Sequence, residues 1–287
     1  MNKRIKLEII LALSVTLLVT QIALFLTNTK GQTPNYWWAA GLSLLAIVSG
    51  SLGLITAKNW SWLKSGVGQA VFFISLGTII WGIGQAGWTY FLFKDPNIAS
   101  PSSRLLDIFF MASIPLWFYG VLKLSQATGA KYGLKKLSGK LLALFLALIM
   151  AVASYYFLVI VARGGFNYFD GQSVFDIFVD LGYSIGEGLI FTLALVVFGL
   201  SWKFLGGRFK YPIIAILAGF GLLYFADFAF SYLDGQGKYF NGDISDFLFL
   251  VAFTVLGVGL CMLDPTRNVK TDKNAELPIP DKAIYSD

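Results

Sequence analysis

Long apolar segments alternate with short polar ones along nearly the whole chain. A run of about 18 or more apolar residues is long enough to cross a bilayer as a helix, and the connections between the runs leave no room for a separate soluble domain. The pattern predicts an all-α integral membrane protein with about eight transmembrane helices. The predicted spans are residues 9–27, 37–57, 66–92, 105–122, 140–162, 174–202, 211–232 and 246–263.

Composition supports this fold class and narrows the chemistry. Hydrophobic residues make up 56% of the chain and charged residues 13%, whereas soluble domains carry about 25% charged residues. The chain has no His and a single cysteine, Cys261. Histidine acid–base chemistry and an intramolecular disulfide are therefore excluded, and the commonest metal and haem ligand is missing. We expect no cofactor and no metal.

The distribution of basic residues predicts the orientation. Positively charged loops stay on the cytoplasmic side, and most of the 22 Lys and Arg residues fall in the segments that share a side with the N-terminus. Both termini are therefore predicted to be cytoplasmic. The net charge of +6 suits the anionic headgroups of a lipid bilayer and requires no nucleic-acid partner. The basic residues predicted to lie outside are Lys30, Lys94, Arg104, Arg163 and Lys238.

The chain contains a weak internal repeat of about 140 residues. SWLKSGVGQ, from Ser61, is similar to SWKFLGGRF, from Ser201, and a second alignment pairs Asp107 with Asp246. The same alignment pairs Gly120 with Gly259. Each half would contain four spans, an even number, so the two halves would be parallel repeats.

The repeat and the polar C-terminus define the predicted domains. The tail is polar, contains proline and lacks periodicity, which is typical of disorder. A cytoplasmic partner could dock on it, or it could be a frayed end. The predicted units are a first four-helix half (1–135), a second four-helix half (136–263) and a disordered cytoplasmic tail (264–287).

The sixth span carries an acidic stripe. On a helical wheel, the stretch DIFVDLGYSIGE places its polar side chains on one face. Two glycines spaced as GxxxG lie on the opposite side, where close helix packing would use them. The polar face consists of Asp176, Asp180, Tyr183, Ser184 and Glu187, and the glycines are Gly182 and Gly186.

Carboxylates in other spans fall at a similar depth. Ionisable groups within spans cost several kcal/mol unless they are paired or hydrated, and by default they indicate function. We therefore predict an acidic pocket that opens outward between the sixth, seventh and eighth spans, with a contribution from the fourth. Its predicted ligand-binding residues are Asp107, Asp176, Asp180, Tyr183, Glu187, Asp227 and Asp246.

Structural roles compete with this prediction. Asp107, Asp243 and Asp246 occupy the first turns of their helices, where carboxylates cap free N–H groups. The deeper carboxylates could form a hydrogen-bonded network that holds helices together. The inner aromatic residues could line an apolar or cationic ligand site or could simply pack. They are Trp81, Trp88, Trp117, Tyr183 and Tyr224.

Several of these segments resemble a polytopic sensory region of bacterial and archaeal signalling proteins. GTIIWGIGQAGWTYFLF, followed by ASPSSRLLDIFFMASIPLWFYGVLKL, is similar to the first half of the N-terminal domain of diguanylate cyclase/phosphodiesterase (GGDEF/EAL) proteins and some histidine kinases. FVDLGYSIGEGLIFTLAL, LLYFADFAFSY and YFNGDISDFLFLVAF resemble its second half. The resemblance implies a multi-pass protein of the prokaryotic cytoplasmic (inner) membrane. It points to Asp107, Asp180, Tyr183, Glu187, Asp227 and Asp246.

The resemblance has two departures. Arg104 and two extra residues interrupt the Pro-Ser-x-x-Asp pattern of that region, and we expect no GGDEF, EAL or kinase output domain after residue 287. The resemblance therefore implies a stand-alone sensor whose signal leaves through a separate cytoplasmic partner, and a homodimer is compatible with this reading.

Three functions remain open at this point. The first is a sensor or receptor-like module that binds a small cationic or amine ligand and has no enzymatic activity. The second is a transporter of a cation, an amine or a proton-coupled solute. The third is an intramembrane hydrolase that uses Asp180 and Asp227. A retinal protein is excluded, because no span has a central Lys for the Schiff base.

Overall fold

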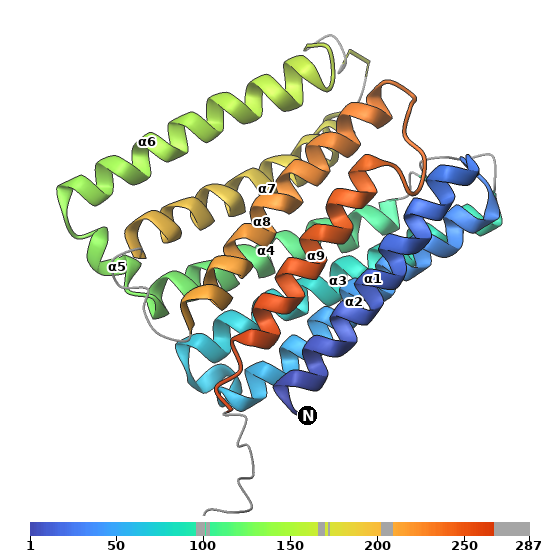
Figure 1. Ribbon diagram of the computed structural model, residues 1–287. Coiled ribbons are helices and arrows are strands. Elements are labelled where there is room, and N and C mark those ends of the chain that lie inside the picture. Colours follow the sequence, from blue (N-terminus) through green and yellow to red (C-terminus); the bar gives the residue numbers. More distant parts are fainter. Residues whose placement is uncertain (96–100, 102–103, 166–169, 172, 202–208, 267–287) are drawn as a thin grey trace, which may run out of the picture.

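The described residues form a bundle of helices and contain no strand (Figure 1). The computed structural model describes residues 1–95, 101, 104–165, 170–171, 173–201 and 209–266, without the side chains of Arg104, Lys131, Phe175, Asp176, Val179 and Asp180. Within these described residues, eight helices are long and apolar enough to cross a membrane, which confirms the eight predicted spans. The long elements are α1 (Lys3–Thr27), α2 (Thr33–Asn59), α3 (Gly66–Lys94), α4 (Arg104–Ala127), α6 (Leu137–Ser154) with its π-helical continuation η2 (Tyr155–Val161), α7 (Val174–Ser201), α8 (Lys210–Gly235) and α9 (Ile244–Met262); η1 (Trp62–Lys64) and α5 (Ala130–Gly133) are short.

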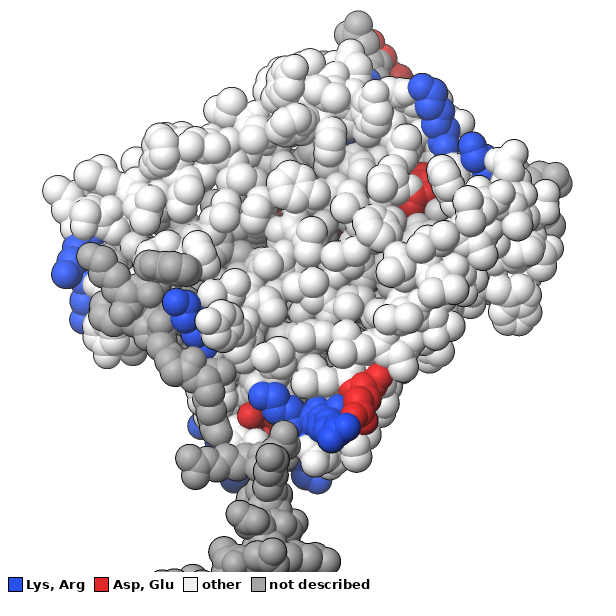
Figure 2. All heavy atoms as spheres, in the orientation of Figure 1, with Lys and Arg blue, Asp and Glu red and all other residues white. Residues whose placement is uncertain are grey.

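The outer surface is apolar between two charged ends. On the face shown in Figure 2, Lys, Arg, Asp and Glu lie near the helix ends, and the broad area between them carries almost none. Large side chains such as Val19, Phe25, Leu137 and Val152 are more than half exposed on this surface. Apolar area on this scale would be a liability in water, whereas it suits contact with lipid. The chain is a polytopic membrane protein.

Side-chain caps start several of the helices. The Asn2 side chain accepts a hydrogen bond from Arg4 N (3.1 Å) at the start of α1, and Ser65 Oγ accepts one from Gly68 N (2.9 Å) at the start of α3. Asp243 caps α9 by accepting hydrogen bonds from the backbone N–H groups of the next helical turn. Each cap satisfies N–H groups that the helix itself leaves without partners.

The helices pack around α3, α4, α8 and α9. The main contacts join α2 to α3, α3 to α4 and α8 to α9, and in addition α2 packs against α9 while α7 packs against α4. In Figure 1, α6 lies at the outer edge next to α7. The buried core therefore sits between two groups of helices, which meet at the α2–α9 and α4–α7 contacts.

Glycines permit close approach between neighbouring helices. A Cβ added to Gly186 of α7 would lie 2.5 Å from Ile114 Cγ2 of α4, and one added to Gly182 would lie 3.2 Å from Met111 Cε. The prediction that these two glycines serve helix packing is confirmed. Such small-residue contacts bring backbones together where lipid provides no hydrophobic driving force.

A buried ion pair joins the two ends of the described chain. Lys6 Nζ of α1 donates a hydrogen bond to Asp264 Oδ2 just after α9 (2.5 Å), and both side chains are fully buried. Lys6 Nζ also donates to Thr56 Oγ1 of α2 (2.9 Å), and Asn59 Nδ2 donates to both Asp264 oxygens (3.1 and 3.0 Å). This network fastens α1, α2 and α9 together on the side of the bundle where the chain begins (Figure 1).

Asp264 belongs to this network, although the sequence places it at the start of the predicted tail. Residues 267–287, which make up the rest of that predicted tail, lie outside the described residues. Burial alone would raise the pKa of Asp264, but the hydrogen bonds from Lys6 and Thr266 outweigh burial and lower the pKa below its ordinary value.

The lowered pKa of Asp264 predicts a loss of stability in acid. A carboxyl group whose pKa is lower in the folded protein stabilises the fold above its ordinary pKa, about 3.9 for Asp. That contribution is lost as the pH falls through the lower, folded-state pKa. Melting curves in detergent at falling pH should therefore show a steeper decrease in melting temperature for the wild type than for Asp264→Asn. Parallel pH profiles for the two proteins would contradict this assignment.

Candidate ligand-binding site

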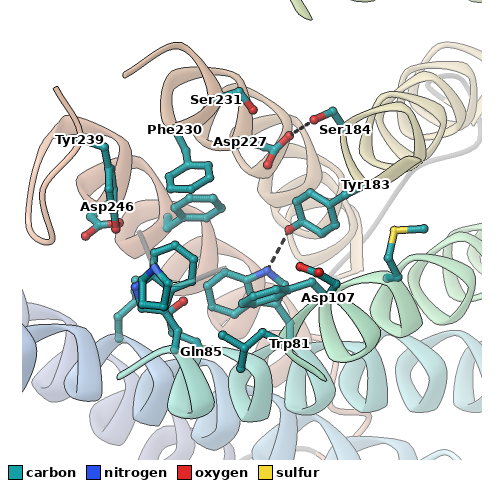
Figure 3. A pocket seen from close by; sticks show the side chains of 17 residues that line it. Trp81, Gln85, Asp107, Tyr183, Ser184, Asp227, Phe230, Ser231, Tyr239 and Asp246 are labelled. Carbon is teal, nitrogen blue, oxygen red and sulfur yellow. Dashed lines mark hydrogen bonds between the residues drawn. The ribbon is translucent and has the colours of Figure 1, made fainter. Parts of the chain in front are cut away.

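A cavity of about 190 Å³ lies among α2, α3, α4, α7, α8 and α9, at the ends of the helices opposite the Lys6–Asp264 pair. A cavity of about 150 Å³ holds a molecule of benzene, so this one has room for a ligand of that size or slightly larger. Its lining combines three carboxylates with seven aromatic rings (Figure 3). They are Asp107, Asp227 and Asp246, with Trp81, Trp88, Phe110, Tyr183, Phe230, Tyr239 and Phe249.

The three carboxylates reach the cavity from three different helices. Asp107 lies in the first turn of α4, and Asp246 lies in the first turn of α9. Asp227 projects from α8, is 4% exposed, and accepts a hydrogen bond from Ser184 Oγ of α7 (2.7 Å). Asp246 Oδ2 accepts one from Gly242 N (2.6 Å). Helix starts thus supply two of the acidic groups, and a helix interior supplies the third.

The loop before α9 is held in place by hydrogen bonds to α2 and α3. Asn241 accepts hydrogen bonds from Trp88 Nε1 at Oδ1 (3.1 Å) and from Asn35 Nδ2 at its backbone oxygen (2.6 Å). Tyr239 OH is placed to donate to Asp246 Oδ1 (3.4 Å). Burial, reinforced by the charge of Asp246, raises the pKa of Tyr239 well above its ordinary value. The Tyr239 hydroxyl therefore stays protonated and acts as a donor within the cavity.

A chain of polar groups leads away from the cavity. Trp81 Nε1 donates to Tyr183 OH (2.9 Å), and Tyr183 OH donates to Glu187 Oε1 (2.9 Å). Glu187 is 3% exposed and does not line the cavity itself. Among the residues described, Glu187 Oε2 has no hydrogen-bond partner. Glu187 therefore lies behind the lining residue Tyr183, to which it is hydrogen-bonded.

Two further polar side chains project into the cavity. Gln85 of α3 is 7% exposed, and Ser231 of α8 is half-buried; both line the cavity. Within the part of the chain that the structure describes, neither the Gln85 amide nor the Ser231 hydroxyl has a hydrogen-bond partner. Buried polar groups are nearly always paired, so this amide and this hydroxyl are available to a ligand or to water.

The predicted site residues divide into three groups. Asp107, Tyr183, Asp227 and Asp246 line one cavity, and Glu187 lies behind Tyr183. Asp176 and Asp180 lie on α7, but their side chains are outside the described part of the structure.

Of the other aromatic residues considered as ligand contacts, two line the cavity and two do not. Trp81 and Trp88 line the cavity. Trp117 is fully buried and donates from Nε1 to Thr78 Oγ1 (3.2 Å), and Tyr224 is hydrogen-bonded to Ser154 Oγ (2.9 Å). Trp117 and Tyr224 therefore belong to the packed interior.

The sequence prediction missed three polar residues of the site, Gln85, Ser231 and Tyr239. The prediction drew the pocket from the fourth, sixth, seventh and eighth spans, and the cavity also includes α2 and α3. A glutamine inside an apolar span was a usable signal for Gln85, whereas Tyr239 lies in a loop that has no such pattern.

Comparison with known proteins adds no assignment. No family model matches the sequence, and no curated protein or solved structure is significantly similar to the chain. Among the described residues, no group of three or more His, Cys, Asp or Glu side chains is placed to hold a metal ion.

Proposed function

We propose that the chain is a membrane sensor or receptor-like module that binds a small cationic or amine ligand in this cavity. The observation that carries the proposal is the lining itself. It contains three carboxylates and seven aromatic rings, and none of the lining residues described is Lys or Arg. Cations are attracted to the faces of aromatic rings, Trp above all, and carboxylates supply the opposite charge.

The energetics of the cavity support a positively charged ligand. Carboxylates away from bulk water are costly unless they are paired or hydrogen-bonded. Asp246 has hydrogen bonds from Gly242 N and from Tyr239 OH, and both of these donors are neutral groups. A bound cation would add a charge-assisted partner, which is the stronger kind of hydrogen bond.

The proposed orientation places the cavity on the outside of a prokaryotic cytoplasmic membrane. Lys3 and Lys6 lie on the side of the bundle that carries the end of α9, where Lys3 Nζ donates to Met262 O (3.0 Å). Basic residues mark the cytoplasmic side, and the cavity lies at the other end of the helices. The proposed contact of the tail with a signalling partner involves residues outside the described part of the chain.

The proposed mechanism is a shift between two parallel four-helix halves. A ligand can change their arrangement only if it binds one arrangement more tightly than the other. The cavity is lined from both proposed halves, by α2, α3 and α4 and by α7, α8 and α9. A ligand that contacts both halves is therefore placed to favour one arrangement over the other.

Transport is the second candidate function, and one observation favours it. The chain of groups Trp81–Tyr183–Glu187 continues the polar lining of the cavity into the interior of the bundle. Buried carboxylates of this kind are typical of ion and proton pathways. Flux of a bound amine across liposomes would distinguish a transporter from a sensor. The hydrolase hypothesis depends on a pair formed by Asp180 and Asp227, and the Asp180 side chain lies outside the described part of the structure.

A binding experiment tests the proposed function. Butylamine should raise the melting temperature of the purified wild type in detergent and should bind in calorimetry, whereas 1-butanol, which is similar in size but neutral, should do neither. The expected difference arises because only the ammonium group offers a charge to the carboxylates. Equal effects of butylamine and 1-butanol would overturn the proposal of a cation site.

A further inference from the structure

Two pairs of neighbouring helices, α3 with α4 and α8 with α9, pack in the same way within each pair. A Cβ on Gly120 of α4 would meet Ile74 N of α3 at 2.9 Å, and one on Gly259 of α9 would meet Ile216 N of α8 at 2.9 Å. In each pair, the next backbone atom is the carbonyl oxygen four residues before the isoleucine, at 3.1 Å. The α3–α4 and α8–α9 pairs therefore share one packing register.

This register relates positions in the two pairs by fixed shifts. The α3 positions map onto α8 by 142 residues (216 − 74 = 142), and the α4 positions map onto α9 by 139 residues (259 − 120 = 139). A second glycine contact agrees with both shifts. A Cβ on Gly77 would meet the side chain of Trp117, and one on Gly219 would meet Leu256.

Applied to the cavity, the register pairs its lining residues. The α4 residues Asp107 and Phe110 map onto Asp246 and Phe249 of α9, with the same residue types at both positions. In the first helix of each pair, Gln85 and Trp88 of α3 map onto Asp227 and Phe230 of α8. All eight residues line the cavity, so the cavity is built from two corresponding half-sites.

The two repeated carboxylates lie on opposite walls. The main contacts of α4 are with α3 and α7, whereas those of α9 are with α1, α2 and α8. Figure 3 shows Asp107, Asp227 and Tyr183 toward one side of the cavity and Asp246 and Tyr239 toward the other. Phe230 and Gln85 lie between these two groups in the same view.

We propose that the ligand of this cavity is a linear diamine with a positive charge at each end. This inference rests on the proposed function and gives its ligand a specific chemical class. One ammonium group binds Asp107 and Asp227, and the other binds Asp246 and the carbonyl oxygen of Gln85. The methylene chain between them lies against Trp88 and Phe230.

The hydrogen-bonding capacity of each end fits an ammonium group. A primary ammonium carries three donors and no acceptor, and carboxylate and amide oxygens are acceptors. The Gln85 amide, which has no hydrogen-bond partner among the described residues, gains one in this arrangement. The two ends are not equal, because the position that is Asp227 in one half-site is Gln85 in the other. A monoamine is therefore expected to prefer the end with two carboxylates.

Calorimetric titration with 1,4-diaminobutane and butylamine tests the inference. The diamine should bind wild type about tenfold more tightly or better, the equivalent of about 1.4 kcal/mol for the second charged end. Asp246→Asn should remove this advantage and should weaken butylamine binding by much less than diamine binding. A melting curve of the variant in the absence of ligand shows whether it is folded.

A second variant tests the end of the cavity that holds Asp246 and Gln85, and it adds a charge there instead of removing one. Gln85→Glu makes the two ends alike in charge, so it should strengthen diamine binding by about tenfold and change butylamine binding by much less. Equal affinities of wild type for the two amines, or no gain in Gln85→Glu, would overturn the two-ended ligand and leave the cation site standing. Absence of binding by both amines would overturn the proposed function itself.

Discussion

Replacement of Lys6 by methionine is expected to lower the free energy of unfolding by about 3–5 kcal/mol, the usual cost of removing one partner from a buried ion pair. The Lys6 and Asp264 side chains are both fully buried, so the variant leaves a carboxylate inside the protein without its cation. The Asn59 and Thr266 hydrogen bonds to Asp264 would remain, but neither carries a charge. Thermal or denaturant unfolding in detergent measures the change.

Two further variants make this prediction specific. Arg4→Met removes a charge from the exposed Arg4–Glu8 pair, whose side chains are 79% and 58% exposed, and should cost less than about 1 kcal/mol. The double variant Lys6→Met/Asp264→Leu should recover much of the lost stability, because apolar groups of similar volume often replace a buried pair without loss. A small effect of Lys6→Met, similar to that of Arg4→Met, would contradict the structural role of the pair.

The Asp227→Asn variant is expected to lower the affinity for butylamine by about 30-fold or more. Loss of one partner from a buried charge pair costs about 2–5 kcal/mol. A monoamine is expected to bind at the end of the cavity that holds Asp107 and Asp227, and Asp227 is the more deeply buried of these two carboxylates. The asparagine can still accept the hydrogen bond from Ser184 Oγ, so the fold should be retained. Calorimetric titration of wild type and variant measures the difference.

Matched controls isolate the charge of Asp227. Asp234→Asn makes the same change in net charge on an exposed residue of the same helix, and it should leave the affinity nearly unchanged. Ser184→Ala removes the hydrogen bond but keeps the carboxylate, so it should weaken binding by less than Asp227→Asn does. If Asp234→Asn weakened binding as much as Asp227→Asn, the effect would be one of net charge and the site would lie elsewhere.

The transmembrane helices were predictable because their signal is local. Each span is an uninterrupted apolar run, and lipid requires every backbone group within it to be paired inside the helix. The helical wheel of the sixth span also placed Gly182 and Gly186 correctly, since their packing against α4 depends on one helix face. Periodicity along one segment was therefore enough to identify these elements.

The limits of the sequence prediction come from contacts between helices. A helical wheel gives the direction of Glu187 but cannot show that Tyr183 separates it from the cavity. Lys6 resembled any basic residue at the membrane rim, and its burial depends on Asp264, which is 258 residues away in the sequence. The contribution of α3 through Gln85 likewise depends on how the two helix pairs meet.

Protection of an introduced cysteine tests the central claim, that a cation occupies this cavity, most directly. Ser231 lines the cavity, and the native Cys261 is fully buried, so Ser231→Cys should supply the reactive thiol for a trimethylammonium-bearing thiosulfonate reagent. Wild type serves as the unreactive control. We predict that 1,4-diaminobutane slows labelling of Ser231→Cys and that the neutral 1,4-butanediol does not. A labelling rate that is unchanged by saturating diamine, or slowed equally by the diol, would contradict the cation site.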